Sequence, residues 1–388
     1  MKKIIIVNNN LKTGGVQVSL LNLLKEIGNL YDVTVLLFYA KKESIEKIPP
    51  SIKVVVVKSP FKYLGMSSSD TKNSPFKFVI RSFWVCITKL FGRSIAISLM
   101  SKFQSTIKGY DFAISYLHEG SKKTFYGGCN EFVLRNIKAQ KKMTWVHCDF
   151  KLCGADNKQS KRIYSLFNTI VACSEGTKAA FVNCLPELEK KCVVVRNCND
   201  YEKIRRLAGE GIQYNKAYFN IVTVARLARE KGIERALMAI RHCIEKGYKV
   251  HYHIVGWGMQ FEYLNKLVDE YHLTNVVTFY GSQDNPYPYM KSPDLFLLPS
   301  YHEAAPMVFD EAACLGVPVL ATKTTSTDEM IIKNGAGFVC ENSQEGIISG
   351  LCEILRDTAV LNRIRENLQQ KHFSNQSSID SLIREVLL

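Results

Sequence analysis

The sequence contains no uncharged stretch that approaches the ~18 residues needed for a membrane-spanning helix. It has no secretory signal either, because the N-terminal apolar run Ile4–Val7 is too short and no cleavage site follows it. CxxC metal and redox motifs are absent, since the closest of its 12 cysteines, Cys148 and Cys153, lie five positions apart. These absences predict a cytoplasmic protein with reduced cysteines.

Acidic residues are scarce relative to basic ones. The chain of 388 residues has 36 Asp and Glu against 51 Lys and Arg, which gives a net charge of +15. This excess favours an anionic partner such as nucleic acid, an anionic membrane surface or a phosphorylated substrate. No nucleic-acid-binding motif is present, so we expect no nucleic acid partner. The length predicts two or three domains with ample hydrophobic cores.

Much of the charge lies in residues 58–108, which carry nine basic residues and one acid, Asp70. Aromatic residues are interleaved with the cations. A basic, aromatic, amphipathic segment can lie on an anionic membrane surface. The pattern is equally typical of helices that cover a sheet and keep their charges solvated, and both interpretations can hold together. If the segment binds membrane, four of its cations are expected to contribute, namely Lys77, Arg81, Lys89 and Arg93.

Short, continuous apolar runs predict the strands of buried parallel sheets. In the first half these runs are 3–7, 33–38, 54–57, 112–116, 143–147, 169–173 and 193–196. The pattern restarts at Phe219, and the second half has runs at 219–224, 249–255, 276–280, 294–298, 317–320 and 337–340. Loops and helical segments separate the runs. We therefore predict an α/β fold of two Rossmann-like halves joined near Asp200, facing each other across a cleft.

Two carboxylates stand out in the second half. Glu303 lies on the loop after the run 294–298, and Glu311 lies in the helix that follows. Ligands of open α/β sheets bind at this carboxyl edge, although such a pair alone is more typical of a helix cap and a solvated helix residue. Arg226 and Lys231 follow the first strand of this half and are suited to a diphosphate, which favours the functional interpretation.

Further features would complete a nucleotide-sugar site. Backbone N–H groups of residues 304–308 lie at a helix N-terminus, where anions bind. Gly256 and Gly258 permit close backbone approach near a nucleotide, and carboxylates suit the hydroxyls of a ribose.

In the first half, Gly14 and Gly15 form a loop before a helix, where phosphates can approach, although a tight turn explains the two glycines equally well. His147 ends a predicted strand at the same sheet edge, and structural and functional roles for it are equally plausible.

The combined motifs resemble the retaining GT-B glycosyltransferases of family 4. The segment S-Y-H-E-A-A-P-M-V-F-D-E-A, with Glu303 and Glu311, is similar to the signature S-x-x-E-G-F-P-x-V-x-x-E-A. Other similar stretches occur in the family's order: Gly14-Gly15, W-V-H at 145–147, V-A-C-S-E at 171–175, R-N-C-N-D at 196–200, V-A-R-L-A-R-E-K-G at 224–232, V-G-W-G at 255–258 and G-V-P-V-L-A-T at 316–322. Each motif is weak alone, but the ordered set is highly specific.

The sequence departs from the family's usual pattern at four positions. Ala304 and Ala305 stand where Gly and Phe are common, which bears on the choice of donor sugar. Trp257 and Cys198 replace a frequent Asp and a frequent Gly. The A-P-M-V variant resembles enzymes that build bacterial capsule, O-antigen or other surface polysaccharides.

The resemblance implies three parts. Residues 1–200 would form the N-terminal, acceptor-binding domain, and residues 201–370 the C-terminal domain that binds the nucleotide sugar. Residues 371–388, with a helix at 379–388, would pack back on the N-terminal domain. The protein would transfer a hexose or N-acetylhexosamine, with retention, from a nucleotide diphosphate sugar to a glycan or lipid-linked acceptor. UDP is the expected base, and the protein would be cytoplasmic or peripheral at the inner face of the cell membrane.

The resemblance also implies residue roles. Arg226 and Lys231 would neutralise the diphosphate, so that neither a metal nor another cofactor is needed. Glu303 would contact the donor sugar and Glu311 the ribose. His147 would lie near the donor sugar and acceptor, and Glu303, His147, Arg226 and Lys231 are the predicted catalytic residues. Donor binding would further involve Gly14, Gly15, Gly256, Gly258, Ala305, Pro306, Met307 and Val308.

Two alternatives stay open. One is a non-transferase enzyme of the same fold, such as a UDP-GlcNAc 2-epimerase. The spacing of Glu303 with Glu311, and of Arg226 with Lys231, disfavours it. The other is a non-catalytic nucleotide-sugar-binding protein at a membrane, against which the presence of all four charged residues argues.

Overall fold

The structure is a computed structural model that describes residues 1–12, 14–72 and 74–387. The chain folds into two compact units. The N-terminal unit comprises Met1–Cys198 together with Asn375–Leu388, and the C-terminal unit comprises Asn199–Ser374. Each unit is built on one sheet. The cleft expected between the two halves stays a prediction.

The N-terminal unit contains a seven-stranded parallel sheet in the order β3-β2-β1-β4-β5-β6-β7. Its strands are β1 (Lys3–Asn8), β2 (Asp32–Leu37), β3 (Lys53–Val56), β4 (Ile107–Ser115), β5 (Ile137–Val146), β6 (Thr169–Ala172) and β7 (Cys192–Val194). All seven strands predicted in the first half are therefore confirmed. The strands β4 and β5 begin earlier than predicted, because their first residues alternate with exposed polar ones and form no continuous apolar run.

The C-terminal unit contains a six-stranded parallel sheet in the order β10-β9-β8-β11-β12-β13. Its strands are β8 (Phe219–Val224), β9 (Val250–Val255), β10 (Val277–Gly281), β11 (Leu295–Leu298), β12 (Val319–Thr322) and β13 (Gly337–Cys340). They confirm the six strands predicted in the second half. In both sheets the first strand lies in the interior and the strand order reverses beside it, as in Rossmann folds.

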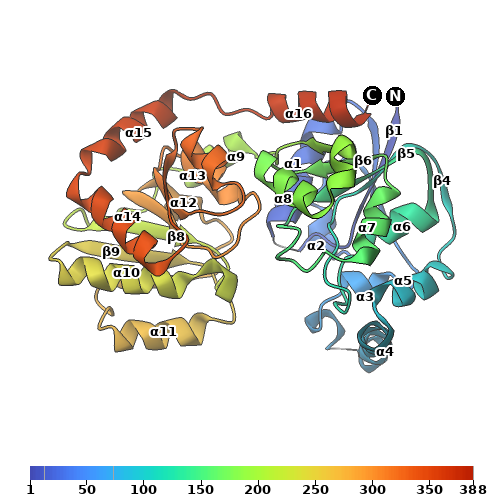
Figure 1. The fold of residues 1–388 in the computed structure, drawn as a ribbon, viewed down its shortest axis with the longest axis horizontal. Helices are drawn as coiled ribbons and strands as arrows, with labels where there is room; N and C mark the ends of the chain where they lie inside the picture. The colour runs from blue at the N-terminus through green and yellow to red at the C-terminus, as the bar shows by residue number, and fades with distance from the viewer. Residues whose placement is uncertain (13, 73, 388) are drawn as a thin grey trace. The chain divides into compact units, whose positions relative to one another are not determined.

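Helices connect the strands in each unit (Figure 1). The N-terminal unit has α1 (Gly15–Ile27), α2 (Lys42–Ile45), α3 (Lys62–Gly65), α4 (Pro75–Phe91), α5 (Arg93–Ser101), α6 (Cys129–Asn136), α7 (Lys158–Ser165), α8 (Glu175–Cys184) and α16 (Gln376–Leu382). The C-terminal unit has α9 (Tyr201–Ala208), α10 (Ile233–Glu245), α11 (Phe261–Glu270), α12 (Tyr287–Lys291), α13 (Met307–Cys314), α14 (Gln344–Arg356) and α15 (Ala359–Gln370).

Local chemistry sets several of these boundaries. The Ser174 hydroxyl accepts a hydrogen bond from the Thr177 N–H at 2.9 Å, as expected for a residue that caps the start of α8. After α13, Gly316 adopts a φ of 76°, a left-handed conformation that suits glycine just beyond a helix end. Leu20, Leu23 and Leu24 of α1 are buried in the core of the N-terminal unit and form the inward side of that helix.

The last helix belongs to the N-terminal unit although it follows the C-terminal unit in the chain. Ile379 and Leu382 of α16, and Val386 in the π-helical turn after it, are buried in the same core as α1. The Lys2 ammonium donates to the Leu387 carbonyl at 2.9 Å, so the two ends of the chain lie together (Figure 1). The predicted return of the last helix is thus confirmed, while its predicted end, Leu388, lies outside the described residues.

The segment 58–108 forms helices that both cover the core and expose apolar side chains. Trp84 of α4 and Ile97 of α5 are buried against the sheet. The outer side of α4, in contrast, exposes Phe76, Val79 and Phe83, which follow one another at helical spacing and are 74%, 63% and 56% exposed. The interpretation as helices that cover the sheet is therefore confirmed for part of the segment, and binding to a membrane stays a prediction.

The four cations expected to face a membrane differ in exposure. Lys77 and Lys89 are exposed and Arg81 is half-buried. The expectation for Arg93 is wrong, since its side chain is only 2% exposed and forms ion pairs inside the unit. Arg93 begins α5 on the side that packs inward, a direction that net charge along the sequence does not reveal.

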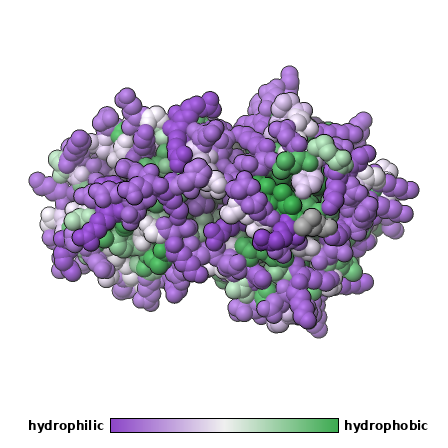
Figure 2. Space-filling model, turned by 90° about the horizontal axis from the view of Figure 1, so that it is seen from above, coloured by the Kyte–Doolittle hydropathy of each residue, from purple (hydrophilic) through white to green (hydrophobic). Residues whose placement is uncertain are grey.

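Among the helices of the described residues, none has the length and hydropathy required to cross a membrane. The face seen in Figure 2 is mostly hydrophilic, with hydrophobic residues gathered in small groups.

Candidate functional site

The strand order of the C-terminal sheet reverses between β8 and β11, which pair in parallel at its centre. Ligands of open α/β sheets bind at such a switch point, just beyond the carboxyl ends of the strands. The loop after β8 carries Arg226 and Lys231, and the loop after β11 carries Glu303. Three of the predicted site residues thus come from the two loops at this point.

Lys231 and Glu303 meet between these loops. The Lys231 Nζ lies 2.5 Å from the Glu303 Oε1, and the two side chains are only 20% and 10% exposed. The Ser300 hydroxyl donates to the same carboxylate oxygen at 2.7 Å. The second oxygen, Oε2, has no hydrogen-bond partner among the described residues. The site therefore presents one half-buried cation and one carboxylate with a free acceptor atom.

Side chains from neighbouring elements hold the loop that carries Glu303 in place. The Thr322 hydroxyl donates to the Ser300 carbonyl at 2.5 Å. The Arg235 guanidinium donates to the Pro299 carbonyl at 2.5 Å and lies 3.8 Å from the centre of the Tyr301 ring. Sequence reasoning did not identify these supporting residues, because nothing in their spacing shows that they converge on one loop.

Arg226 is more exposed than Lys231. Its side chain is 70% exposed and its guanidinium lies 2.6 Å from the Glu230 carboxylate, four residues later. An exposed pair of this kind contributes only about 0.2–1 kcal/mol, so Arg226 can leave Glu230 for a stronger anion at little cost.

The structure explains the glycines at 256 and 258 by close packing of the backbone rather than by the expected approach of a nucleotide. A Cβ at Gly256 would lie 1.8 Å from the Ala225 carbonyl oxygen, and one at Gly258 would lie 2.2 Å from the Leu227 carbonyl oxygen. The loops after β8 and β9 therefore pack backbone against backbone. Their glycines fix the loop that carries Arg226, while their contact with a donor stays a prediction.

Residues 305–308 lead into the start of α13. The helix begins at Met307 after Pro306, and among the described residues no side chain caps it. Its first N–H groups have no partner within the helix, and Met307 and Val308 therefore offer donors to an anion beside Glu303.

Glu311 lies one turn into α13 and is 9% exposed. Burial, and then the neighbouring charge of Asp310, raises its pKa to about 7, while a hydrogen bond from the Tyr287 side chain works in the opposite direction. Tyr287 begins α12, the helix after β10. The predicted ribose-binding carboxyl is therefore half-protonated near neutral pH and is held by a tyrosine that sequence reasoning missed.

The predicted residues of the N-terminal unit lie at the carboxyl edge of its own sheet. Gly14 precedes α1 with an extended backbone, and Gly15 is the first residue of that helix. No atom lies within 4 Å of where a Cβ of Gly15 would stand, considering the neighbours that the structure describes. Gly15 therefore borders open space.

His147 follows β5, and its ring centre lies 4.8 Å from that of Tyr116, the residue after β4. Burial, and then the charge of His118, lowers the pKa of His147 to about 3. Its buried Nε2 has no hydrogen-bond partner in the described part of the chain. His147 is thus a neutral imidazole at physiological pH, suited to hydrogen bonding rather than to proton abstraction in the free protein. His118, which sequence reasoning did not single out, behaves similarly, since burial and then Arg93 lower its pKa to about 4.

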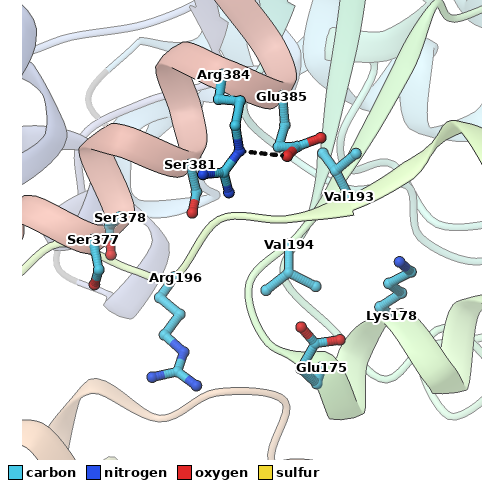
Figure 3. Close-up of a pocket in the computed structure, with 10 residues that line it drawn as sticks. All are labelled: Glu175, Lys178, Val193, Val194, Arg196, Ser377, Ser378, Ser381, Arg384 and Glu385. Carbon is cyan, nitrogen blue, oxygen red and sulfur yellow. Dashed lines mark hydrogen bonds and ion pairs between the residues drawn. The ribbon is translucent and has the colours of Figure 1, made fainter.

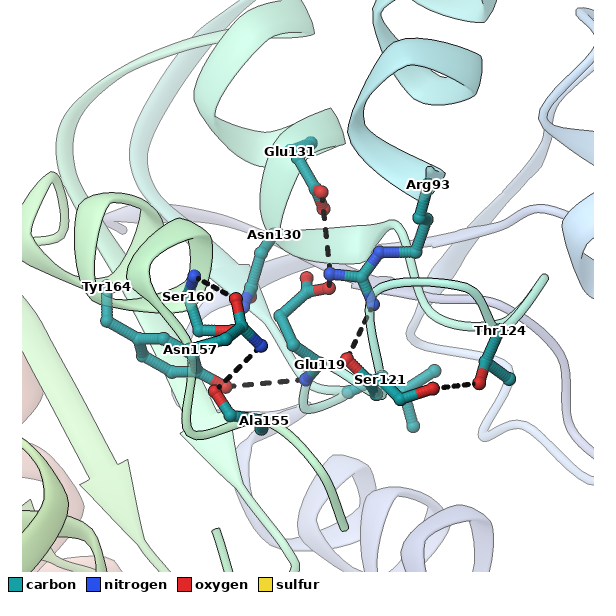
Figure 4. A network of polar contacts seen from close by, with 12 residues as sticks. Arg93, Glu119, Ser121, Thr124, Asn130, Glu131, Ala155, Asn157, Ser160 and Tyr164 are labelled. Carbon is teal, nitrogen blue, oxygen red and sulfur yellow. Dashed lines mark hydrogen bonds and ion pairs between the residues drawn. The ribbon is translucent and has the colours of Figure 1, made fainter. Parts of the chain in front are cut away.

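A buried ionic network holds the loop after β4 in place (Figure 4). Arg93 pairs with Glu119, in the loop after β4, and lies 3.6 Å from Glu131 of α6. Burial raises the pKa of Glu119 well above its usual value, although Arg93 opposes that shift. Two buried carboxylates share one guanidinium, so we expect one of them, Glu119, to hold a proton. The Glu119 N–H donates to the Tyr164 hydroxyl at 3.3 Å, which ties this loop to α7.

The N-terminal unit also contains an open cavity of about 430 Å³ beside β7, α8 and α16 (Figure 3). Its polar lining comprises three cations, two carboxylates and three hydroxyls, namely Lys178, Arg196, Arg384, Glu175, Glu385, Ser377, Ser378 and Ser381. Arg384 is paired with Glu385 at 2.8 Å. In the residues that the structure describes, no group of three or more His, Cys, Asp or Glu is arranged to hold a metal ion.

Comparison with known families gives one match. Residues 210–371, nearly the whole C-terminal unit, match the family Glycosyl transferases group 1. Among curated proteins, the chain is 29% identical over 181 residues to a putative colanic acid biosynthesis glycosyltransferase, WcaL, of Salmonella typhimurium, covering 43% of this chain and 44% of the relative. It is 26% identical over 222 residues to a diphospho-undecaprenol 4-alpha-N-acetylgalactosaminyltransferase of Campylobacter jejuni, covering 57% of this chain and 58% of that one. The chain thus spans about half the length of these relatives.

Solved structures resemble the whole chain. The Anabaena protein Alr3699/HepE, in complex with UDP-glucose, matches with a TM-score of 0.69 at 18% identity and covers 99% of this chain and 100% of its own. WaaG, a glycosyltransferase involved in lipopolysaccharide biosynthesis, matches with a TM-score of 0.59 at 15% identity, covering 98% and 99% of the two chains. These likenesses confirm the predicted GT-B class with its two Rossmann-like domains.

Proposed function

We propose that this chain, whose C-terminal unit carries a glycosyl transferases group 1 domain, is a retaining, metal-independent glycosyltransferase. Its donor would be a nucleotide diphosphate sugar, with UDP as the preferred base. Its acceptor would be a glycan or a lipid-linked saccharide in surface polysaccharide biosynthesis. The relatives named above support this last step, since two of them are described by their part in colanic acid or lipopolysaccharide biosynthesis.

The meeting of Lys231 and Glu303 at 2.5 Å, on the two loops at the switch point, is the main support for this function. A cation for the diphosphate and an acceptor for sugar hydroxyls are both needed where the sugar leaves its phosphate. Without a donor the two side chains neutralise each other. A diphosphate would compete for Lys231 and so free the Glu303 Oε1 to accept a hydrogen bond from the sugar.

The leaving group would be stabilised by fixed charge. Negative charge grows on the diphosphate as the glycosidic bond breaks, and Lys231, Arg226 and the first N–H groups of α13 would lie around it. Glu311 would hold the ribose hydroxyls in its ionised form. Retention would follow from departure and attack on the same face of the sugar, with the donor phosphate accepting the acceptor's proton.

The N-terminal unit would bind the acceptor, near Gly15 and His147. Because burial keeps the His147 imidazole neutral, its Nε2 would accept a hydrogen bond from a sugar hydroxyl. The basic and hydroxyl-rich cavity beside β7 (Figure 3) is a second place where an anionic part of an acceptor could be held.

A donor panel tests this function. We would measure thermal stabilisation and slow hydrolysis with UDP-, GDP- and ADP-sugars, for the wild type and for Glu303→Ala. We expect one base to stabilise the wild type, and hydrolysis to fall by about 10²-fold or more in Glu303→Ala. An absence of any nucleotide effect on the wild type would overturn the proposal.

The chain supplies a matched control for the second cation. Arg241 forms an exposed pair with Glu245 four residues later, at 2.8 Å, much as Arg226 does with Glu230. We expect Arg226→Ala to weaken nucleotide binding and Arg241→Ala to leave it unchanged. Equal effects would mean that Arg226 is only a surface charge.

We also propose that α4 holds the protein on an anionic membrane that carries the acceptor. Residues 71–110 contain no acid, and α4 exposes the apolar side chains of Phe76, Val79 and Phe83 as well as the cations Lys77 and Lys89. Apolar side chains at the headgroup boundary with cations beside them are typical of helices that lie in a membrane surface.

Sedimentation with liposomes of phosphatidylglycerol or phosphatidylcholine tests this surface. Phe76→Ser/Phe83→Ser and Lys77→Glu/Lys89→Glu are each expected to reduce binding to the anionic liposomes. The matched control is Leu166→Ser, another exposed apolar residue of the same unit but far from α4 in sequence. Unchanged binding of both α4 variants would refute the membrane role.

A further inference from the structure

Two free thiols lie together in the loop after β5. The Sγ atoms of Cys148 and Cys153 are 3.0 Å apart, closer than the usual contact of two sulfur atoms. Both residues are partly exposed. Cys148 directly follows His147, the residue predicted to lie near the donor sugar and the acceptor.

The loop itself brings the two cysteines together. The Asp149 carboxylate accepts from the Leu152 N–H at 3.1 Å, and the Cys153 N–H donates to the Asp149 carbonyl at 3.0 Å. Gly154, with a φ of 73°, then turns the chain away. These contacts close a compact turn within five residues, which the sequence spacing alone did not reveal.

The pair also has the asymmetry of a reactive dithiol. The Cys148 thiol donates toward the Cys153 sulfur, which lowers the pKa of Cys153, with help from the Ala155 backbone. The same hydrogen bond, followed by burial, raises the pKa of Cys148. Cys153 is therefore the thiol of the pair that loses its proton more readily and attacks first, and Cys148 is the thiol that then attacks the mixed disulfide.

We propose that Cys148 and Cys153 form a reversible disulfide by exchange with a low-molecular-weight disulfide, and that this bond switches off the site beside His147. The formation of the bond depends only on the geometry of the loop. Its effect on transfer rests on the function proposed above.

The exchange balances without a further reagent. The Cys153 thiolate attacks one sulfur of glutathione disulfide, forms a mixed disulfide and releases one glutathione thiolate, which takes up a proton. The Cys148 thiol then loses its proton and attacks the Cys153 sulfur, which releases a second glutathione. The protein loses two electrons and two protons, and the oxidant gains both.

Closing the bond would disturb two features of the site. The sulfurs must move about 1 Å closer to reach disulfide length, and the backbone next to His147 must turn with them. The Cys153 thiol also points to the Glu119 carbonyl at 3.8 Å, a contact that needs its proton. Displacement of a site by about 1 Å can cost up to about 10²-fold in rate.

The test is to incubate the full chain with glutathione disulfide and glutathione in varied ratios, trap free thiols, and map the cysteine peptides by mass spectrometry. We expect a 148–153 linked peptide that dithiothreitol reverses. Cys148→Ser and Cys153→Ser should each prevent it. Two internal controls are available. Cys86 is exposed, and we expect it to give only a mixed disulfide. Cys129 is fully buried, so it should not react.

Transfer or donor hydrolysis is measured on the same samples. We expect a loss of about tenfold or more in the oxidised wild type, full recovery on reduction, and no loss in Cys153→Ser, which lacks the attacking sulfur. Cys148→Ser should stop at the mixed disulfide on Cys153. A mixed disulfide at Cys86 without a linked 148–153 peptide would overturn the proposal. A linked peptide with unchanged activity would overturn the switch, and the peptide map does not depend on the protein being a transferase.

Discussion

Replacing Glu311 with Gln is expected to stabilise the protein while weakening nucleotide binding. Glu311 is buried in α13, and burial with the charge of Asp310 raises its pKa from 4.5 to about 7. Its ionised form is therefore disfavoured in the folded state. Glutamine has the same shape, and its carbonyl oxygen can still accept the hydrogen bond from Tyr287. The variant removes the charge without leaving the tyrosine unpaired.

The size of the effect follows from the pKa difference. A carboxyl whose pKa rises on folding binds more protons in the folded than in the unfolded protein between the two pKa values. Its contribution therefore destabilises increasingly as the pH rises from about 4.5 to about 7, and is constant above that. Linkage gives a penalty of about 1.4 kcal/mol at a pH of about 5.5 and about 3.4 kcal/mol at a pH of about 8.

Denaturant unfolding at these two pH values measures the prediction. Glu311→Gln should gain about 3 kcal/mol at the higher pH and about 2 kcal/mol less than that at the lower one. UDP binding should weaken in the variant, because an amide is a poorer acceptor for two ribose hydroxyls. In the wild type, UDP binding should likewise weaken as the pH falls below about 7.

Glu353→Gln is the matched control, since Glu353 is an exposed glutamate of the same unit. It should change neither stability nor its dependence on pH. A Glu311→Gln protein that loses stability, or whose gain is the same at both pH values, would refute the raised pKa. A stabilised variant with unchanged UDP affinity would instead refute the ribose role.

Three further predictions follow from the described contacts. Arg93→Met leaves Glu119 and Glu131 buried without their cation and should destabilise the N-terminal unit by about 3–5 kcal/mol in denaturant unfolding, whereas Glu119→Gln should cost far less. Gly256→Ala would set a Cβ 1.8 Å from the Ala225 carbonyl, so the loop carrying Arg226 must shift, and UDP affinity measured by calorimetry should fall. Gly15→Ala adds a methyl group in open space at a helical position and should stabilise by up to about 1 kcal/mol; a simultaneous fall in the transfer rate would show that a substrate approaches this point.

The fold was predictable because its strands are buried on both faces. Continuous apolar runs such as 4–7 and 295–298 are typical of strands that are covered on both faces of a parallel sheet. The early parts of β4 and β5 were missed because exposed and half-buried residues predominate there and form no continuous apolar run. Arg93 was misjudged for a related reason. The sequence does not distinguish an arginine that is buried and paired with carboxylates from one at the surface.

The contacts between the predicted site residues could not be read from the sequence. Glu303 and Lys231 are 72 positions apart, and only the adjacency of β8 and β11 makes them neighbours. Gly256 and Gly258 were predicted to allow close approach of a nucleotide, but the atoms that lie close to them in the structure are backbone atoms of Ala225 and Leu227. The sequence did not indicate the raised pKa of Glu311, because it does not show which side of a helix faces the core.

The ion pair at the switch point leads to a prediction that differs between two ligands. Glu303→Gln removes the partner that holds Lys231, so UDP alone should bind more tightly, by about 1 kcal/mol or about fivefold. A UDP-sugar should gain less or lose affinity, because the variant also lacks the carboxylate for the sugar hydroxyls. Lys231→Ala should weaken both ligands, since it leaves Glu303 facing the diphosphate. In the double variant the loss of UDP affinity should be smaller than in Lys231→Ala, because the repulsion has gone. Calorimetry with UDP and UDP-sugar on all four proteins measures the cycle, and additive effects for UDP would show that Lys231 and Glu303 act independently despite their contact.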